Sequence, residues 1–265
     1  MKRIIVVTGA SSGMGKEFLV QILEKEKDID EVWAIARREE RLIELKEKVS
    51  EKIVPIKMDL SDEKDLKKYR EKLEKEKPSI VILANCAGFG VFEHTENIDT
   101  EVKLNMIDLN VKAPVAMIDY SLPYMGRGSK IMNIASCAGF QPIPYINDYA
   151  ATKAFLLSYS RALNKELRYK GIHVLAVTPY WTKTEFFDRA VDEGKKKVVI
   201  NYNAMYDPTE VMKLAIKDLY TKKDVSIYGF VNRGQRILTK VLPHALVMKV
   251  WMNQQKLDGT PGIRK

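Results

Sequence analysis

The chain has 265 residues, of which 46% are hydrophobic and 30% are charged. This composition excludes an intrinsically disordered chain, and the length is compatible with one α/β domain. The net charge of +9 would favour anionic partners, but acidic and basic residues are interleaved along 37–52 and 61–77. Such interleaving predicts solvated helix faces and no nucleic-acid groove.

The two cysteines, Cys86 and Cys137, have no spacing partner for a metal site or a disulfide framework. We therefore expect no metal and a reducing, cytoplasmic setting. The first apolar run, 4–7, is too short for a signal peptide, and no run reaches the roughly 18 apolar residues that span a bilayer.

Seven apolar runs predict the strands of a parallel sheet. They cover residues 4–7, 32–36, 53–58, 80–84, 130–135, 172–177 and 225–228. Continuous apolar runs are typical of strands buried on both faces, and helical stretches separate them as in repeated βαβ units. We therefore predict, over 1–265, a single Rossmann-type doubly wound parallel sheet domain with helices on both faces and ligands at the carboxyl ends of the strands.

The first strand leads directly into a glycine-rich turn, Thr8-Gly-Ala-Ser-Ser-Gly-Met-Gly15, which is followed by a helical pattern. Such a turn brings backbone N–H groups and a helix N-terminus close to a phosphate, so it predicts a nucleotide cradle. Arg37 and Arg38 follow the second strand, where arginine accommodates a 2′-phosphate. The alternative is ordinary surface arginine, and we favour NADP over NAD.

Tyr149 and Lys153 are four residues apart in a predicted helix that ends near Gly171, so their side chains share a helix face. A neighbouring ammonium lowers the pKa of a phenol, which is ordinarily about 10. The pair is therefore predicted to exchange a proton near neutral pH, and ordinary helix surface is the alternative.

The remaining segments carry weaker patterns. Residues 100–124 are predicted to form a helix with Asn110 near its middle and a kink at Pro114. The aromatic stretch 180–206 is predicted to cover the substrate, or else to pack between two helices. After a helix over 207–222, a C-terminal helical extension is expected at 232–265. Its part 237–251 fits an interfacial membrane helix, a subunit contact or a wall of the substrate pocket.

Several motifs stand in chain order: the turn 8–15, Asn85-Cys-Ala-Gly88, Asn110, Ser136 and Tyr149-x-x-x-Lys153. With them the chain resembles the short-chain dehydrogenase/reductase family up to the last strand. Tyr180 after Pro179 is similar to the branch of hydroxysteroid dehydrogenases and long-chain 3-ketoacyl reductases. The resemblance implies an oxidoreductase that forms a homodimer or homotetramer and acts on a small-molecule apolar ketone or alcohol, and Arg37 and Arg38 favour NADP(H) as its cofactor.

The resemblance also implies roles for four catalytic residues. Tyr149 would be the general acid and base, and Lys153 would hold the nicotinamide ribose and lower the pKa of Tyr149. Ser136 would bind the substrate oxygen, and Asn110 would help hold a water beside Lys153. The implied cofactor contacts are Thr8, Gly9, Ser11, Ser12, Gly13, Met14, Gly15, Arg37, Arg38, Asp59, Leu60, Asn85, Ala87, Gly88, Asn110, Tyr149, Lys153, Pro179, Thr182 and Thr184.

Two departures from the family pattern lie in the motifs that are expected to contact the cofactor. Cys86 stands in place of a second asparagine, which we interpret as a change in sheet packing, and Ser12 replaces a basic residue found in some NADP-dependent members. The expected activity interconverts a secondary alcohol and a ketone on a bulky apolar substrate, a hydroxysteroid or bile acid first. The alternatives are a 3-ketoacyl or small-carbonyl reductase and a non-catalytic NADP-binding regulator.

Overall fold

The computed structural model describes residues 1–191 and 198–257, and its centre is one sheet of seven parallel strands. The strand order is β3-β2-β1-β4-β5-β6-β7, so the order reverses between β1 and β4. The strands are β1 (Arg3–Thr8), β2 (Glu31–Ala36), β3 (Ile53–Lys57), β4 (Ser79–Asn85), β5 (Lys130–Ile134), β6 (His173–Val177) and β7 (Val225–Ser226). The predicted fold class is confirmed, and the reversal marks the edge where such sheets bind ligands.

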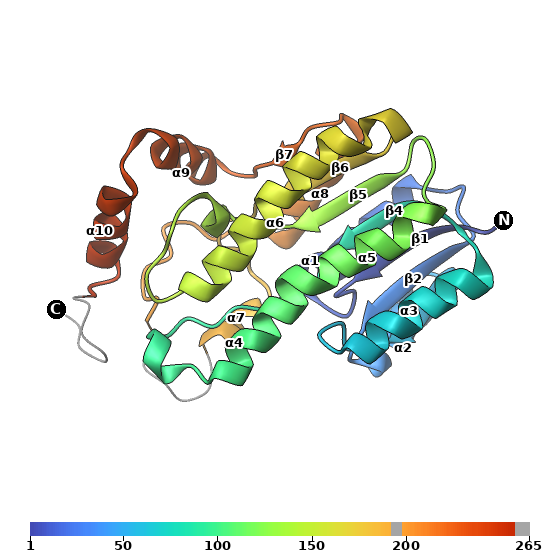
Figure 1. Cartoon of the computed structure of the whole chain (residues 1–265), viewed down its shortest axis with the longest axis horizontal. Helices are drawn as coiled ribbons and strands as arrows, with labels where there is room; N and C mark the ends of the chain where they lie inside the picture. The colour runs from blue at the N-terminus through green and yellow to red at the C-terminus, as the bar shows by residue number, and fades with distance from the viewer. Residues whose placement is uncertain (192–197, 258–265) are drawn as a thin grey trace.

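A layer of helices covers each face of this sheet (Figure 1). One layer contains α1 (Gly13–Lys25), α2 (Glu39–Val49) and α8 (Pro208–Tyr220), and the other contains α3 (Glu63–Glu76), α5 (Ala113–Ser121) and α6 (Asn147–Glu166). In β1, Ile5 and Val7 pack under the first layer, whereas Ile4 and Val6 pack under the second. Successive strand residues point to opposite faces, so a strand covered on both sides is apolar throughout.

The predicted helix over 100–124 is divided into pieces. Helix α4 (Thr100–Ile107) passes into a π-helical turn, Asp108–Lys112, and α5 begins after it, with Pro114 in its first turn. The Ala113 N–H donates to the Asp108 carbonyl, so the π-helical turn runs directly into α5, and proline, which has no N–H, follows that bond. The irregularity therefore lies just before Pro114, and it contains the buried Asn110.

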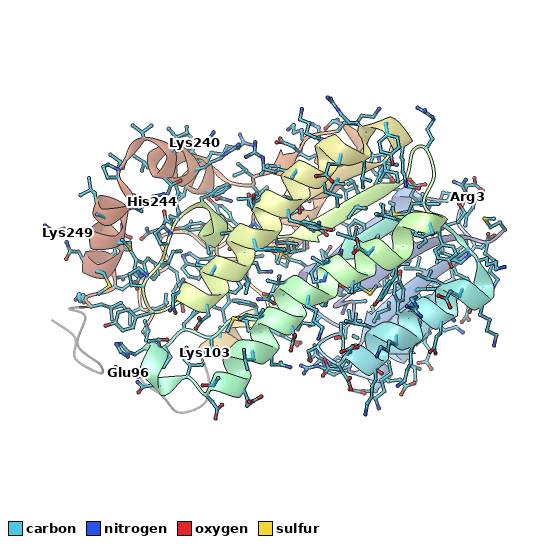
Figure 2. The ribbon with its side chains drawn as sticks, in the orientation of Figure 1. Arg3, Glu96, Lys103, Lys240, His244 and Lys249 are labelled. Atoms are coloured by element: carbon cyan, nitrogen blue, oxygen red, sulfur yellow. The ribbon has the colours of Figure 1, made fainter. Side chains whose placement is uncertain are left out.

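The C-terminal segment forms two helices, because Leu242-Pro243 separates α9 (Phe230–Val241) from α10 (His244–Gln254). Both lie beyond the end of the sheet that is farther from the N-terminus (Figure 1). Lys240 of α9 and His244 and Lys249 of α10 are exposed (Figure 2). Within 1–191 and 198–257, no helix has both the length and the apolarity needed to cross a bilayer. Residues 192–197 of the predicted segment 180–206 and residues 258–265 of the predicted extension 232–265 lie outside the described residues.

Candidate active site

A groove of about 260 Å³ lies at the carboxyl ends of β1, β2 and β4, where the strand order reverses. Helix α1 starts at this groove, and its N-cap Ser12 makes no side-chain capping bond, so the first N–H groups remain available to an anion. A Cβ on Gly15 would lie 2.3 Å from the Gly9 carbonyl oxygen, so the turn closes only with glycine there. The cradle therefore fits a dinucleotide phosphate.

Most predicted cofactor contacts line this groove. They are Gly9, Ser11, Ser12, Gly13, Met14, Gly15, Arg37, Arg38, Asp59, Leu60, Ala87, Gly88 and Thr184. Thr8 and Asn85 instead lie beneath it: the Thr8 hydroxyl accepts the backbone N–H groups of Cys86 and Ala87 at 3.0 and 3.1 Å. The Asn85 amide donates to the Asn133 side chain at 2.9 Å. These two residues support the groove and do not line it.

Cys86 lines the groove, which our interpretation as a sheet-packing change did not anticipate. Burial raises the pKa of its thiol to about 12. A thiol that keeps its proton at neutral pH is a poor nucleophile, which agrees with a non-catalytic role.

The two predicted phosphate-binding arginines differ in their contacts. Arg38 donates to the hydroxyls of Ser12 and Ser11 at 2.7 and 3.2 Å, so it faces the glycine turn. Arg37 lies 3.8 Å from the Asp59 carboxylate. Glu185 binds Arg38 at 2.8 Å and Arg41 at 2.6 Å. We predicted a role for neither Glu185 nor Arg41, because no local pattern marks an ion pair between positions 144 residues apart.

Beside the groove, Ser136 and Tyr149 line a second cavity. Ser136 caps the short 3₁₀ turn Cys137–Phe140, where its hydroxyl accepts the Ala138 N–H at 3.1 Å. Burial raises the pKa of the Tyr149 phenol, and a hydrogen bond with Ser136 opposes this by a smaller amount. We predicted a lowered pKa from Lys153 alone; in the fold the burial of the phenol is the larger effect.

Lys153 lies behind Tyr149, with its ammonium nitrogen 5.6 Å from the centre of the phenol ring. The side chain is buried and donates to the Ile134 carbonyl at 2.8 Å. Burial lowers the pKa of Lys153 to about 8 because an ammonium loses hydration inside the protein. Lys153 is therefore buried and Tyr149 is half-buried, so the predicted pair is not ordinary helix surface.

Asn110 fixes the backbone next to this pair. Its amide donates to the Phe89 carbonyl at 2.8 Å and its oxygen accepts the Phe89 N–H at 3.1 Å. It also donates to the Thr152 hydroxyl at 3.1 Å, which in turn donates to the Tyr149 carbonyl at 2.7 Å. Asn110 thus connects the loop after β4 to helix α6, and Thr152, which the sequence did not single out, is the connecting residue.

The cavity beside Tyr149 has a volume of about 470 Å³, and most of its lining is apolar. Its aromatic members are Phe92, Tyr149, Tyr180, Trp181, Phe186, Phe187, Phe230 and Trp251. The rings of Phe186 and Tyr149 lie 5.4 Å apart. A Cβ on Gly90 would lie 2.9 Å from an atom of the Tyr149 ring and 3.0 Å from an atom of the Phe186 ring. Gly90, another residue we had not predicted, lets the loop after β4 approach the phenol closely.

Side chains of α9, of α10 and of the link between them form one wall of this cavity, among them Leu238, Trp251 and, in the link, Leu242. The Trp251 indole donates to the Pro144 carbonyl at 3.0 Å, so α10 is attached to the loop before Tyr149. A wall of the substrate pocket is one of the three alternatives predicted for 237–251. Ile237 and Val241 remain 63% and 75% exposed, so the membrane and subunit alternatives stay predictions.

Gln141 is the polar lining residue with the most unusual environment. It is only 9% exposed, and its side-chain oxygen is buried with no hydrogen-bond partner among the described residues. An unpaired buried acceptor ordinarily costs about 1 to 3 kcal/mol, so a partner such as water or a group of a ligand would stabilise it. The sequence offered no signal for it.

Three comparisons place this geometry among known proteins. The family model described as short chain dehydrogenase matches residues 3–195. The chain is 32% identical to the very-long-chain 3-oxoacyl-CoA reductase of Homo sapiens, over 98% of this chain and 82% of that protein. A short-chain dehydrogenase from Sphingobium yanoikuyae in complex with NADPH superposes with a TM-score of 0.74 at 25% identity, over 92% of this chain and 97% of the other.

A second solved structure is the bulky-bulky ketone specific alcohol dehydrogenase from Comamonas testosteroni. It superposes with a TM-score of 0.71 at 26% identity and covers 92% of this chain and 96% of its own. The similarity therefore extends over the sheet and well beyond the glycine turn.

Proposed function

Because the chain belongs to the short chain dehydrogenase family and is an NADP(H)-dependent oxidoreductase of alcohol and carbonyl groups, we propose that its substrate is a bulky apolar ketone or secondary alcohol. A hydroxysteroid or bile acid is the first candidate. The observation that carries the proposal is the apolar cavity of about 470 Å³ beside Ser136 and Tyr149. Pockets that enclose most of a drug-sized ligand range from about 300 to 1,000 Å³.

In the proposed reaction, NADPH supplies the hydride when it is bound. The Ser136 hydroxyl donates a hydrogen bond to the substrate carbonyl oxygen, and the Tyr149 phenol gives that oxygen its proton. A raised phenol pKa suits this direction, because Tyr149 keeps its proton until the oxygen becomes basic. Lys153, charged below about pH 8, would hold the ribose hydroxyls of the cofactor.

Gln141 narrows the proposed substrate further. Its buried oxygen can accept a hydrogen bond, so a substrate hydroxyl or amide N–H in the cavity would satisfy it. We therefore expect a mostly apolar substrate that carries a second polar group away from the reacting carbon.

A 3-ketoacyl or small-carbonyl reductase is the second candidate. The similarity to the human 3-oxoacyl-CoA reductase over nearly the whole chain favours an acyl substrate. A small carbonyl compound would leave most of the aromatic lining uncovered, and burial of each CH₂ group is worth about 0.8 kcal/mol.

A substrate panel with NADPH separates these candidates. It contains 3-dehydrolithocholate, 3-dehydrodeoxycholate with its additional hydroxyl, a 3-oxoacyl thioester and acetone. We expect kcat/KM for the keto bile acids to exceed that for acetone by at least about 10²-fold. A thioester preferred over both bile acids would overturn the steroid assignment, and binding of NADPH without turnover of any compound would indicate a non-catalytic regulator.

Gln141→Leu tests the second polar contact in the same assay. We expect it to lower kcat/KM for the hydroxylated bile acid about three- to tenfold relative to the one without the hydroxyl. Gln235→Leu, the same change at another residue of the cavity, is the matched control and should leave the ratio unchanged. An unchanged ratio in Gln141→Leu would contradict the contact.

A further inference from the structure

Glu185 lines the cofactor groove and belongs to an ion-pair cluster that the proposed chemistry does not use. Its carboxylate binds Arg38 at 2.8 Å, and its two oxygens lie 2.6 and 2.9 Å from the same Arg41 nitrogen. Arg38 at the same time donates to the hydroxyls of Ser11 and Ser12. The cluster therefore joins the segment after β6, the start of α2 and the glycine turn.

This cluster contains the donors that a phosphate monoester requires. Two guanidinium groups and two hydroxyls converge, and guanidinium binds phosphate and carboxylate oxygens in the same forked geometry. Arg38, Glu185 and both serines line the cofactor groove. Since the enzyme uses NADP(H), the 2′-phosphate of the cofactor and the Glu185 carboxylate suit the same donors.

The net charge of the cluster decides whether the Glu185 carboxylate strengthens or weakens binding of the 2′-phosphate. Two arginine charges face one carboxylate in the cluster, and hydrogen bonds from Arg38 and Arg41 lower the pKa of Glu185, which therefore stays ionised at neutral pH. A 2′-phosphate brings up to two further negative charges to the same place. Glu185 would then repel the phosphate and occupy its donors.

We propose that Glu185 is an internal competitor for the 2′-phosphate of NADP(H), and that it sets the affinity of the groove for phosphorylated over unphosphorylated cofactor. Glu185 lies directly between Thr184 and Phe186, which line both the groove and the aromatic cavity. Exchange of the carboxylate for the phosphate therefore acts on the segment that borders Tyr149, whose ring lies 5.4 Å from Phe186.

Binding of cofactor fragments to the full chain tests the competition without any substrate. Calorimetric titration would compare 2′,5′-ADP, which carries the 2′-phosphate, with 5′-AMP, which lacks it. For Glu185→Gln we expect 2′,5′-ADP to bind about three- to tenfold more tightly, as befits loss of a partly exposed ion pair, and 5′-AMP to change less than about twofold. The variant should fold normally, because the Glu185 side chain is 45% exposed.

Glu39→Gln is the matched control for the general field of one negative charge. Glu39 stands next to Arg38 in the chain, but its carboxylate pairs with Lys57 at 3.9 Å. We expect it to tighten 2′,5′-ADP binding by less than about twofold, because exposed charges without contact are screened by salt. Weaker or unchanged 2′,5′-ADP binding in Glu185→Gln, or equal tightening in both variants, would overturn the proposal. A failure of the substrate panel would leave this result unaffected.

Discussion

The cofactor groove and the aromatic cavity meet at Met14, Thr184 and Phe186, yet they are built in different ways. The groove is formed by a turn of eight residues and by strand ends, and it offers backbone N–H groups and arginine side chains. The cavity is assembled mainly from side chains of loops and of two C-terminal helices, together with Tyr149 of α6. A groove made largely of backbone can recognise one cofactor in many proteins, whereas a cavity made of side chains can change its substrate by substitution.

Tyr149 lies close to the boundary between the groove and the cavity, because its ring is 5.4 Å from that of Phe186, and Ser136 lines the same cavity. Lys153 and Asn110 are buried behind that boundary and contact backbone groups of the surrounding elements. The arrangement gives the boundary rigid support, and proton transfer depends on such fixed geometry.

The largest effect should come from Tyr149→Phe, which removes the proposed proton donor and leaves both pockets in place. We expect kcat for ketone reduction to fall about 10²- to 10⁴-fold, the usual contribution of general acid catalysis. NADPH affinity, measured by fluorescence titration, should stay within about twofold. Tyr180→Phe, in the same cavity, is the control and should lose far less activity; comparable losses in both would show that packing and not the phenol is responsible.

An intermediate effect, confined to the groove, is expected for Arg38→Ala. Hydrogen bonds to charged groups are worth about 1.5 to 3 kcal/mol, so NADPH should bind about 10- to 100-fold more weakly while NADH changes little. Arg37→Ala should weaken NADPH binding less than Arg38→Ala does, because Arg37 faces Asp59 and not the glycine turn. Equal losses for NADPH and NADH would contradict a phosphate-binding role for Arg38.

The smallest expected effect is a fall in kcat/KM for NADPH above pH 8, by about tenfold per pH unit. Lys153 has a pKa of about 8 in the fold, below its ordinary 10.5, so it loses its charge as the pH rises through 8. We expect kcat/KM for NADPH, which reports the free enzyme, to fall about tenfold per unit above that value. The Cys86 thiol, with a pKa of about 12, cannot cause this decline.

Lys153→Arg checks the assignment, because a guanidinium stays charged throughout this range. The decline near pH 8 should then disappear, even if overall activity is lower. The same decline in the variant would assign it to another group.

Local patterns were sufficient for much of this molecule. All seven strands were predicted, because a parallel strand between two helix layers is apolar over its whole length. The errors occurred where tertiary contacts override a local pattern. The last strand was predicted over 225–228 but covers only Val225–Ser226, because it pairs with β6 over two residues only. The predicted helix 100–124 is interrupted at Asn110, whose side chain bonds the loop after β4.

Contacts between distant residues were beyond any local pattern. Arg37 and Arg38 are identical in type and adjacent, and only the fold directs Arg38 to the glycine turn and Arg37 to Asp59. Glu185 and Gln141 gained their importance in the same way, one from an ion pair and the other from a buried, unpaired oxygen.

By itself, the sequence determined the glycine turn, the succession of strands and helices, and the spacing that places Tyr149 and Lys153 on one helix face. These depend on neighbours within a few residues, whose conformations follow from backbone sterics and hydrophobic period. The tertiary structure alone decided the pKa directions of Tyr149 and Lys153 and the aromatic lining around them. Desolvation and cavity shape depend on atoms that the chain brings together from far apart, so no local pattern could contain them.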